Sequence, residues 1–385
     1  MKILTIQFAF MFLCSLAHAQ NKVSGYLIDT RAFDSNAGHW YGIRDKHNVI
    51  NPKKNQPKYK TSDLVAVGDN IVLYQKNNGG WPKNYDVMAV LTSDQKDSLF
   101  KDKANLNTTF DNGTSYTHVA CLAGIYQATK IKKYATAATD GLNYIMAAQY
   151  NNGGWPQYFP LQNNYSRHIT YNDDVFAGIM ELLKEVKDNK KLYSFLNNAV
   201  KKKVEVAYQK GIGCILNTQI NDFGEITAWC QQHDEVTLKP AWARAFEPPA
   251  ICNGESAGIV LLLMDIDNPS EEVKTSVKHA IDWFNESAIQ GIRVKVIPAA
   301  PDTSQYTVSN IDRVVVQDLT APTIWTRYYE LQTHRPLFCN RDSKVVYALK
   351  EVERERRSGY AWYTYNPQKV LNQYPVWAKK WGVDK

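Results

Sequence analysis

Apolar residues recur at helical spacing in the middle of the chain. In HVACLAGIYQATKI (118–131) one face carries Val119, Leu122, Ile125 and Tyr126, and GLNYIMAAQY (141–150) continues the same periodicity. NDDVFAGIMELLKEVKD (172–188) repeats it with Val175, Ile179, Leu182, Leu183 and Val186. Asn172 and Asp173 stand where the N-cap of that last helix is expected. These stretches therefore predict amphipathic helices.

Two nearly identical turns punctuate the helices. QKNNGGWPKNYD (75–86) returns 74 residues later as QYNNGGWPQYFP (149–160). Two glycines followed by Trp-Pro cannot continue a helix, so each copy predicts a turn that holds one large ring, Trp81 or Trp155. A degenerate third copy keeps Gln219, Asn221, Gly224 and Trp229. The repeating unit is therefore two helices and a loop.

Three such units predict the fold class. Further helices are expected near GESAGIVLLLMDI (254–266) and SVKHAIDWFNESA (276–288). Three α/α hairpins with their loops on one side predict a mainly α protein built as an incomplete α/α toroid. From about residue 290 the runs IRVKVIP and DRVVVQD predict small β-rich elements in the C-terminal part. We expect residues 20–385 to form one two-lobed domain with a cleft.

The first residues resemble an export signal. Lys2 precedes an apolar run from Ile3 to Leu16, and Ala17-His18-Ala19 matches a small-residue cleavage site. Residues 1–19 are therefore expected to be a cleaved signal peptide, and the protein to be secreted or periplasmic. No later stretch is long and apolar enough to predict a membrane span.

Composition excludes some classes of partner and leaves others open. Without the leader, 44 basic residues face 38 acidic ones, a net charge of +6 that permits an acidic partner without requiring one. No nucleic-acid motif is present. We expect a monomer without nucleic-acid or membrane partners. Five cysteines remain, too few for a disulfide framework, although one or two bridges are allowed in an oxidising compartment.

Two acidic turns suggest a metal site. TTFDNGTSYTH (108–118) carries Asp111 and Asn112, and HITYNDDV (168–175) carries Asp173 and Asp174, each just before a helix. Capping of that helix explains either turn taken alone. Adjacent hairpins, however, would aim both turns at the same surface, where clustered oxygen ligands suit a hard cation such as calcium.

Arginines supply the opposite charge. LKPAWARAFEPP (238–249) places Arg244 three residues before Glu247, which also permits a purely structural Arg–Glu pair. TIWTRYYELQTHRPLFCNRD (323–342) carries Arg327, Arg335 and Arg341 among aromatic residues. Because arginine binds planar carboxylates through two parallel hydrogen bonds, this set indicates a polyanionic substrate.

The ordered motifs resemble the family 10 polysaccharide lyases, which are pectate lyases. The motifs are TFDNGTSYTH, NGGWPQYFP, TYNDDV, TAWCQQHD, KPAWARAFEPP, TRYYELQTHRPLFCNRD and SGYAWY, and they run from about residue 40 to 365. The resemblance implies calcium-dependent cleavage of polygalacturonate by β-elimination, which leaves a 4,5-unsaturated end. It also implies Arg244 as the base, Asp111 and Asp173 as metal ligands, and Asn112, Arg327 and Arg341 as substrate-binding residues. Whether Asp173 or Asp174 is the ligand stays open.

Other functions remain possible at this point. A helical toroid also supports inverting glycoside hydrolysis, with Asp111 and Asp173 as general acid and base. A non-catalytic periplasmic protein that binds acidic sugars needs the arginines and aromatics but no base. Terpenoid cyclases share Gly-x-Trp repeats and an Asp-Asp pair, but an export signal and polar loops argue against them. Trp81 and Trp155 could stack on a sugar or pack between hairpins, and packing is favoured.

Overall fold

A computed structural model describes residues 25–42, 48–189, 191–304 and 308–383. The expected signal peptide lies outside these residues. Eleven α-helices are described: α1 (Asp34–Gly42), α2 (Leu64–Tyr74), α3 (Ser93–Lys101), α4 (Tyr116–Thr129), α5 (Lys132–Ala148), α6 (Val175–Asp188), α7 (Asn198–Thr218), α8 (Asn253–Met264), α9 (Glu271–Glu286), α10 (Arg354–Gly359) and α11 (Asn366–Trp381). Among them, no helix is both long and apolar enough to cross a bilayer.

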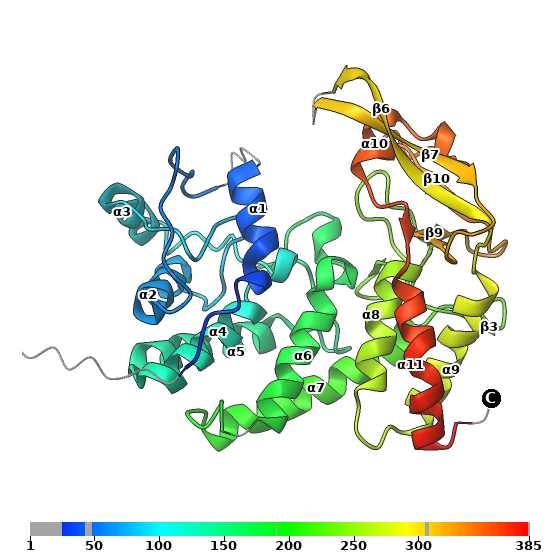
Figure 1. Ribbon diagram of the computed structural model, residues 1–385. Helices are drawn as coiled ribbons and strands as arrows, with labels where there is room; N and C mark the ends of the chain where they lie inside the picture. The colour runs from blue at the N-terminus through cyan, green and yellow to red at the C-terminus, as the bar shows by residue number, and fades with distance from the viewer. Residues whose placement is uncertain (1–24, 43–47, 190, 305–307, 384–385) are drawn as a thin grey trace, which may run out of the picture.

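The helices form two layers of antiparallel hairpins. The hairpins are α4–α5, α6–α7 and α8–α9; α4, α6 and α8 pack side by side in one layer, and α5, α7 and α9 follow one another in the second (Figure 1). Helix α2 closes one end of the stack against α4 and α5, and α11 closes the other against α8 and α9. The prediction of an incomplete α/α toroid with three hairpins is confirmed.

Glutamine amides join each helix of the second layer to the next. Gln75, Gln149 and Gln219 follow directly on the last residues of α2, α5 and α7. Their side-chain nitrogens donate to main-chain oxygens one repeat further on: Gln75 to Ala137 at 2.9 Å, Gln149 to Ala207 at 2.9 Å and Gln219 to Ser276 at 3.0 Å. Each amide also bonds an oxygen within its own turn, Gly79, Gly153 or Thr227. The repeated sequence therefore makes the same connection three times; we call this pair of amide hydrogen bonds the glutamine joint.

The tryptophans of the repeated turns belong to the core. The Trp81, Trp155 and Trp229 side chains are fully buried, and their indole N–H groups donate to the carbonyls of Ile71, Ile145 and Ile215 on the preceding helices at 2.8 to 2.9 Å. Packing, the favoured role, is confirmed, because a ring without solvent contact cannot stack on a sugar.

The paired glycines of these turns allow close approach to the next hairpin. Gly79 and Gly153 have φ angles of +89° and +94°. A Cβ atom on Gly79 would lie 2.4 Å from the Asp140 carbonyl oxygen, and one on Gly153 would lie 2.0 Å from that of Lys210. Both the backbone conformation and the missing side chain are therefore required. Gly224 of the third copy shares the positive φ, at +97°, but a Cβ atom there would have nothing within 4 Å.

The C-terminal part carries small sheets, as predicted. Its strands are β6 (Ile292–Thr303), β7 (Val308–Gln317), β8 (Trp325–Thr326), β9 (Tyr328–Tyr329), β10 (Pro336–Cys339), β11 (Val345–Val346) and β12 (Tyr363–Thr364). Five two-residue strands lie among the helices: β1 (Ile169–Thr170), β2 (Asn221–Asp222), β3 (Glu225–Ile226), β4 (Gln232–His233) and β5 (Ile251–Cys252). The β6–β7 ribbon is longer than the two short runs suggested and extends away from the helices (Figure 1). A four-stranded sheet of order β11-β10-β9-β5 joins this part to the helices, because β5 leads directly into α8.

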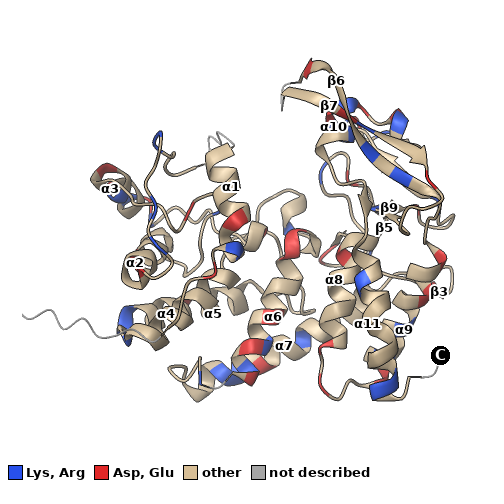
Figure 2. Ribbon diagram, viewed as in Figure 1, with Lys and Arg blue, Asp and Glu red and all other residues tan. Residues whose placement is uncertain are grey.

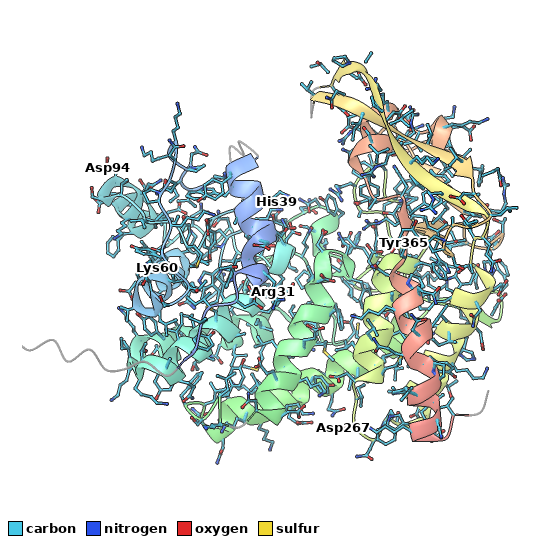
Figure 3. All side chains as sticks on the ribbon, in the orientation of Figure 1. Arg31, His39, Lys60, Asp94, Asp267 and Tyr365 are labelled. Atoms are coloured by element: carbon cyan, nitrogen blue, oxygen red, sulfur yellow. The ribbon has the colours of Figure 1, made fainter. Side chains whose placement is uncertain are left out.

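The surface carries both charges, and the interior is closely filled. Lysine and arginine gather on the β6–β7 ribbon and at the tip of the α4–α5 hairpin, whereas acidic residues are scattered along the helices (Figure 2). Side chains occupy the space between the helical layers (Figure 3). All five cysteines in the described part of the chain are buried free thiols, so none of the permitted disulfides forms there.

The glutamine joint can be tested with Gln149→Ala. This change leaves the Gly153 and Ala207 carbonyls without the amide donor, so we expect the free energy of unfolding to fall by about 1–3 kcal/mol. Urea denaturation monitored by circular dichroism measures it. Gln209→Ala, on the exposed face of α7, is the matched control and should change stability by less than about 0.5 kcal/mol. If both substitutions lowered the free energy of unfolding equally, the Gln149 amide would have no special role in joining the helices.

Candidate active site

The two acidic turns meet, and neither caps its helix with a side chain. Asp111–Gly113 and Asn172–Asp174 form single 3-10 turns that pack against each other. The prediction that Asn172 and Asp173 lie at the N-cap of α6 is wrong: Asp174 occupies that position and makes no side-chain capping bond. The cap of α4 is Ser115 rather than Asp111. Capping therefore does not explain either acidic turn.

The backbone of both turns is left-handed at a non-glycine residue. Asn112 and Asp173 both have φ of 54°, and Asp174 has φ of 55°. Such a conformation is disfavoured for residues with a side chain and is common where a site fixes it in place. The residues that enter the two turns are anchored alike, because Phe110 N donates to the Gln157 carbonyl and Tyr171 N to the Gln231 carbonyl.

Asp111 is held by a lysine that the sequence analysis did not identify. Its carboxylate is buried and forms an ion pair with Lys83 Nζ. Lys83 follows the first Gly-Gly-Trp-Pro turn, and its ammonium lies 5.6 Å from the ring centre of Tyr158. Burial opposes the lysine charge, but Asp111 outweighs it and the pKa of Lys83 is raised. Its position beside the repeated motif is the one sequence signal that could have revealed it.

The pKa of Asp173 is shifted by burial and by the charged groups around it. Desolvation, followed by the Asp111 carboxylate, raises the pKa of Asp173 to about 7, although Arg244 and Arg327 act to lower it. The side chain still reaches solvent, and its Oδ2 accepts a bond of 2.9 Å from the amide of Asn172. Asp111, Asp173, Arg244 and Arg327 therefore lie close enough to interact, as the motifs implied.

Arg244 is paired with Glu247. Arg244 Nε donates to Glu247 Oε2 at 2.8 Å, Arg244 Nη2 binds Oε1, and the Arg244 backbone N–H adds a third bond at 3.0 Å. Glu247 is fully buried, whereas the Arg244 side chain is 43% exposed. Burial opposes the guanidinium charge, but the bonds to Glu247 outweigh it and raise the pKa of Arg244. Nη1 takes no part in this pair.

Aromatic hydroxyls extend this pair into the core. Tyr360 donates to Glu247 Oε1 at 2.8 Å, the hydroxyls of Tyr360 and Tyr328 lie 2.7 Å apart, and Tyr328 donates to Gln231 Oε1 at 2.7 Å. Gln231 also anchors the Asp173 turn through its carbonyl. A line of short polar contacts therefore connects Arg244 to the segment that positions Asp173, and the two hydroxyl protons serve two of its three contacts.

The other two predicted arginines have their own carboxylate partners. Arg327 Nη2 binds Glu255, and its guanidinium lies 4.7 Å from the ring centre of Tyr360. Arg341 binds both oxygens of Glu355 at 2.8 and 3.0 Å. The guanidinium groups of Arg341 and Arg244 both contact the ring of Phe246, at 5.1 and 4.9 Å. Arg327 is thus near enough to Asp173 to lower its pKa, and Arg341 shares the Phe246 ring with Arg244.

Several polar atoms in this region are buried without a hydrogen-bond partner. Among the described residues they include Asn172 Oδ1, Gln231 Nε2, Arg327 Nε and Glu255 Oε2. A buried polar atom without a hydrogen bond lowers the stability of the folded state. Such atoms are therefore rare in proteins unless a ligand or a water molecule supplies the missing hydrogen bond. In this region a bound water or ligand would supply the missing partners.

A polar groove opens beside the acidic turns. It has a volume of about 790 Å³, and its walls include Lys83, Lys101, Tyr158, Gln162 and Tyr165. Desolvation raises the pKa of Tyr165, and Arg244, Lys83 and Asp111 lie near enough to affect it. Tyr165 therefore connects the groove to the arginine side of the site.

Two solved structures are similar to this chain over nearly its whole length. A family 10 polysaccharide lyase from Cellvibrio cellulosa superposes with a TM-score of 0.67 and 26% sequence identity, covering 93% of this chain and 99% of its own. A mutant of that enzyme in complex with trigalacturonic acid superposes with a TM-score of 0.66 at 26% identity, covering 93% and 100%. No curated protein matches.

The family itself is shown by sequence. Residues 75–371, most of the chain and all of the residues described above as the site, match the pectic acid lyases. This protein belongs to the pectic acid lyase family.

Proposed function

We propose that this protein cleaves polygalacturonate by calcium-dependent β-elimination, with Arg244 as the base and 4,5-unsaturated oligogalacturonides as products. The observation that carries the proposal is the meeting of two acidic turns with Arg244 and Arg327 at one place. Cations beside carboxylates fit a substrate that bears one carboxylate per sugar. The relative solved with trigalacturonic acid supports the same substrate class.

The residues present fit a calcium ion. Asp111 and Asp173 offer carboxylate oxygens, and Asn172 Oδ1 is a buried oxygen without a hydrogen bond. Desolvation, and after it the neighbouring Asp111 carboxylate, raises the pKa of Asp173, and a cation would offset both effects; Lys83 already neutralises part of the charge on Asp111. Calcium prefers oxygen ligands of this type, and substrate carboxylates would complete the set. We therefore assign Asp173, rather than Asp174, as the second acidic ligand.

The reaction starts at a weakly acidic proton. The C5 hydrogen of galacturonate is alpha to a carboxylate, and its removal builds negative charge on that group. A bound calcium ion would supply positive charge there and stabilise it. Arg327 adds a second positive charge near Asp173. Asn112 on the first turn and Arg341 beyond Phe246 are proposed to bind neighbouring parts of the saccharide.

Arg244 can accept the proton only at high pH. Glu247 favours the charged guanidinium and occupies its Nε–Nη2 edge, so the neutral form needed by a base is rare at neutral pH. The elimination should therefore accelerate as pH rises through the alkaline range. Glu247 also fixes the plane of Arg244, which keeps Nη1 in a constant direction.

Two other functions were compatible with the sequence. An inverting hydrolase would use Asp111 and Asp173 as acid and base, and a binding protein would need no base at all. Membership of the pectic acid lyases favours the lyase over both. We also propose that residues 20–385 act as one exported, monomeric catalytic unit.

The reaction class is tested by its product. Incubation with polygalacturonate should raise ultraviolet absorbance from the new C4–C5 double bond, and a calcium chelator should abolish the rise. Added calcium should restore it, and substitution Asp111→Asn should prevent that restoration because one ligand is lost. Saturated reducing ends without the absorbance would establish a hydrolase instead.

The role of Arg244 is tested by comparison with a second arginine on the same ring. Arg244→Ala should lower kcat by about 100- to 10,000-fold with KM changed little, since general-base catalysis typically contributes that factor. Arg356→Ala, whose guanidinium lies 4.8 Å from the Phe246 ring centre, is the control and should change kcat far less. Melting temperatures separate catalysis from folding. If Arg244→Ala is merely unstable and turns over normally per folded molecule, the Arg244–Glu247 pair is structural.

The charge at Asp173 is tested by stability against pH without calcium. Its folded pKa of about 7 lies above the unfolded value of about 3.9, so its contribution to stability is present at low pH and lost as pH rises through 7. Asp173→Asn should therefore gain stability over the natural protein between pH 5 and 8. Asp97→Asn, exposed on α3, should show no such gain. Denaturation midpoints measure this, and parallel curves for all three proteins would contradict the assignment.

A further inference from the structure

A second group of ligand-type side chains lies outside the proposed active site. His334 is in the turn between β9 and β10, Asp222 and Glu225 are on the β2–β3 hairpin, and Glu286 is the last residue of α9. His334 Nδ1 lies 4.0 Å from a carboxylate oxygen of Glu225 and 4.0 Å from one of Glu286. Three segments distant in the sequence thus converge on one imidazole.

The imidazole is oriented as in a metal site. Its other nitrogen, Nε2, lies 3.2 Å from Oδ2 of Asp222, whose side chain is only 8% exposed. A histidine that binds a metal usually donates its second N–H to a carboxylate in this way, which leaves the remaining nitrogen as the ligand. Trp283 packs edge-on against the ring, with the ring centres 4.9 Å apart, and limits its rotation.

The spacing leaves room for an ion. Metal bonds of about 2.0–2.2 Å in a tetrahedral site separate the ligand atoms by roughly 3.4 Å. The observed separations of 4.0 Å are too long for hydrogen bonds and need to close by only a few tenths of an ångström. Glu225 and Glu286 are about half exposed, so their side chains are free to make that adjustment.

The charges in this group favour a cation. Three carboxylates surround one imidazole, which is an excess of negative charge. Glu286 also stands at the C-terminal end of α9, where the helix dipole favours positive charge and disfavours a carboxylate. A divalent cation would offset both unfavourable effects.

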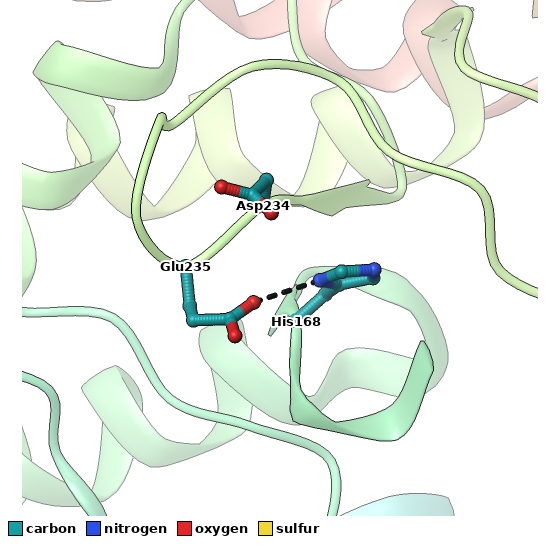
Figure 4. A group of neighbouring side chains, drawn as sticks. All are labelled: His168, Asp234 and Glu235. Carbon is teal, nitrogen blue, oxygen red and sulfur yellow. Dashed lines mark hydrogen bonds and ion pairs between the residues drawn. The ribbon is translucent and has the colours of Figure 1, made fainter. Parts of the chain in front are cut away.

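A second histidine cluster in the chain provides the contrast. His168 Nδ1 is already 2.9 Å from Glu235 Oε2, as drawn in Figure 4, and Arg167 Nε lies 2.6 Å from the other oxygen of that carboxylate. Asp234 Oδ1 accepts backbone bonds from Val236 and Thr237. These contacts fill the space and neutralise the charge, so this cluster needs no ion.

We propose that His334, Glu225 and Glu286 bind a divalent transition metal such as Zn²⁺, with Asp222 orienting the imidazole. An imidazole with two carboxylates suits zinc, whereas calcium prefers an all-oxygen set. The metal fastens the β2–β3 hairpin and the end of α9 to the β9–β10 turn. It acts on stability and is separate from the calcium proposed above.

Zinc titration of the full-length protein tests the site. After treatment with a chelator and its removal, calorimetry with Zn²⁺ should show one saturable site, and zinc should raise Tm. His334→Gln should weaken this binding at least a hundredfold, and Asp222→Asn by about 10- to 100-fold, as expected for loss of an orienting carboxylate. His168→Gln is the matched control and should leave zinc affinity unchanged.

Two further measurements keep the test decisive. Glu286→Gln alters a half-exposed side chain and should fold normally while losing zinc affinity, which separates binding from stability. Co²⁺ should give the spectrum of nitrogen and oxygen ligands; a thiolate charge-transfer band would place the ion at one of the cysteines. The proposal is overturned if zinc does not saturate a site, if its affinity survives both His334→Gln and Glu286→Gln, or if His168→Gln abolishes it.

Discussion

The side-chain amide of one glutamine per repeat sets the spacing of the helices. Gln75, Gln149 and Gln219 each end a helix and bind a main-chain carbonyl on the second helix of the following hairpin, so α2, α5, α7 and α9 are joined in series. Fixed spacing of the hairpins also fixes the loops at this same end of the stack, where the first helix of each hairpin begins. The acidic turns that begin α4 and α6 therefore lie one repeat apart and touch, although 61 residues separate Asp111 from Asn172 in the chain.

The contact between the two turns brings two negatively charged side chains, Asp111 and Asp173, close together. Two carboxylates held together in partly desolvated surroundings repel each other, and the chain offsets this with Lys83, Arg244 and Arg327. Both arginines are in turn held by buried glutamates, Glu247 and Glu255. The result is an alternation of charges in which four polar groups still lack partners among the described residues. An anionic sugar and a cation would complete it, which connects the fold to the proposed chemistry.

Much of the fold could be predicted because the repeat depends on short sequence patterns that act locally. Gly-Gly-Trp-Pro stops a helix wherever it occurs, and apolar stripes mark α4 and α6 without knowledge of their neighbours. Helix α7 is less evident, because part of its buried face consists of Ala207, Gly211 and Cys214, whose small side chains give a weak pattern. The candidate site was found through motifs, but Lys83 and the N-cap at Asp174 were not. Both depend on how distant segments meet, and no periodicity encodes that.

The pairing of β5 with β9 has a consequence for how this chain can be divided. Ile251 and Cys252 lead into α8, and their partners Tyr329 and Tyr328 follow Arg327 directly. The backbone of the third hairpin is thus hydrogen-bonded, through β5, to the strand that directly follows Arg327. Cutting the chain after α9 would leave the edge of β5 unpaired and would separate Glu255 from its ion-pair partner Arg327. The helical stack is therefore not a module that can be exchanged between proteins. A chimaera with a related protein should therefore be joined before α8, or the chain should be left undivided.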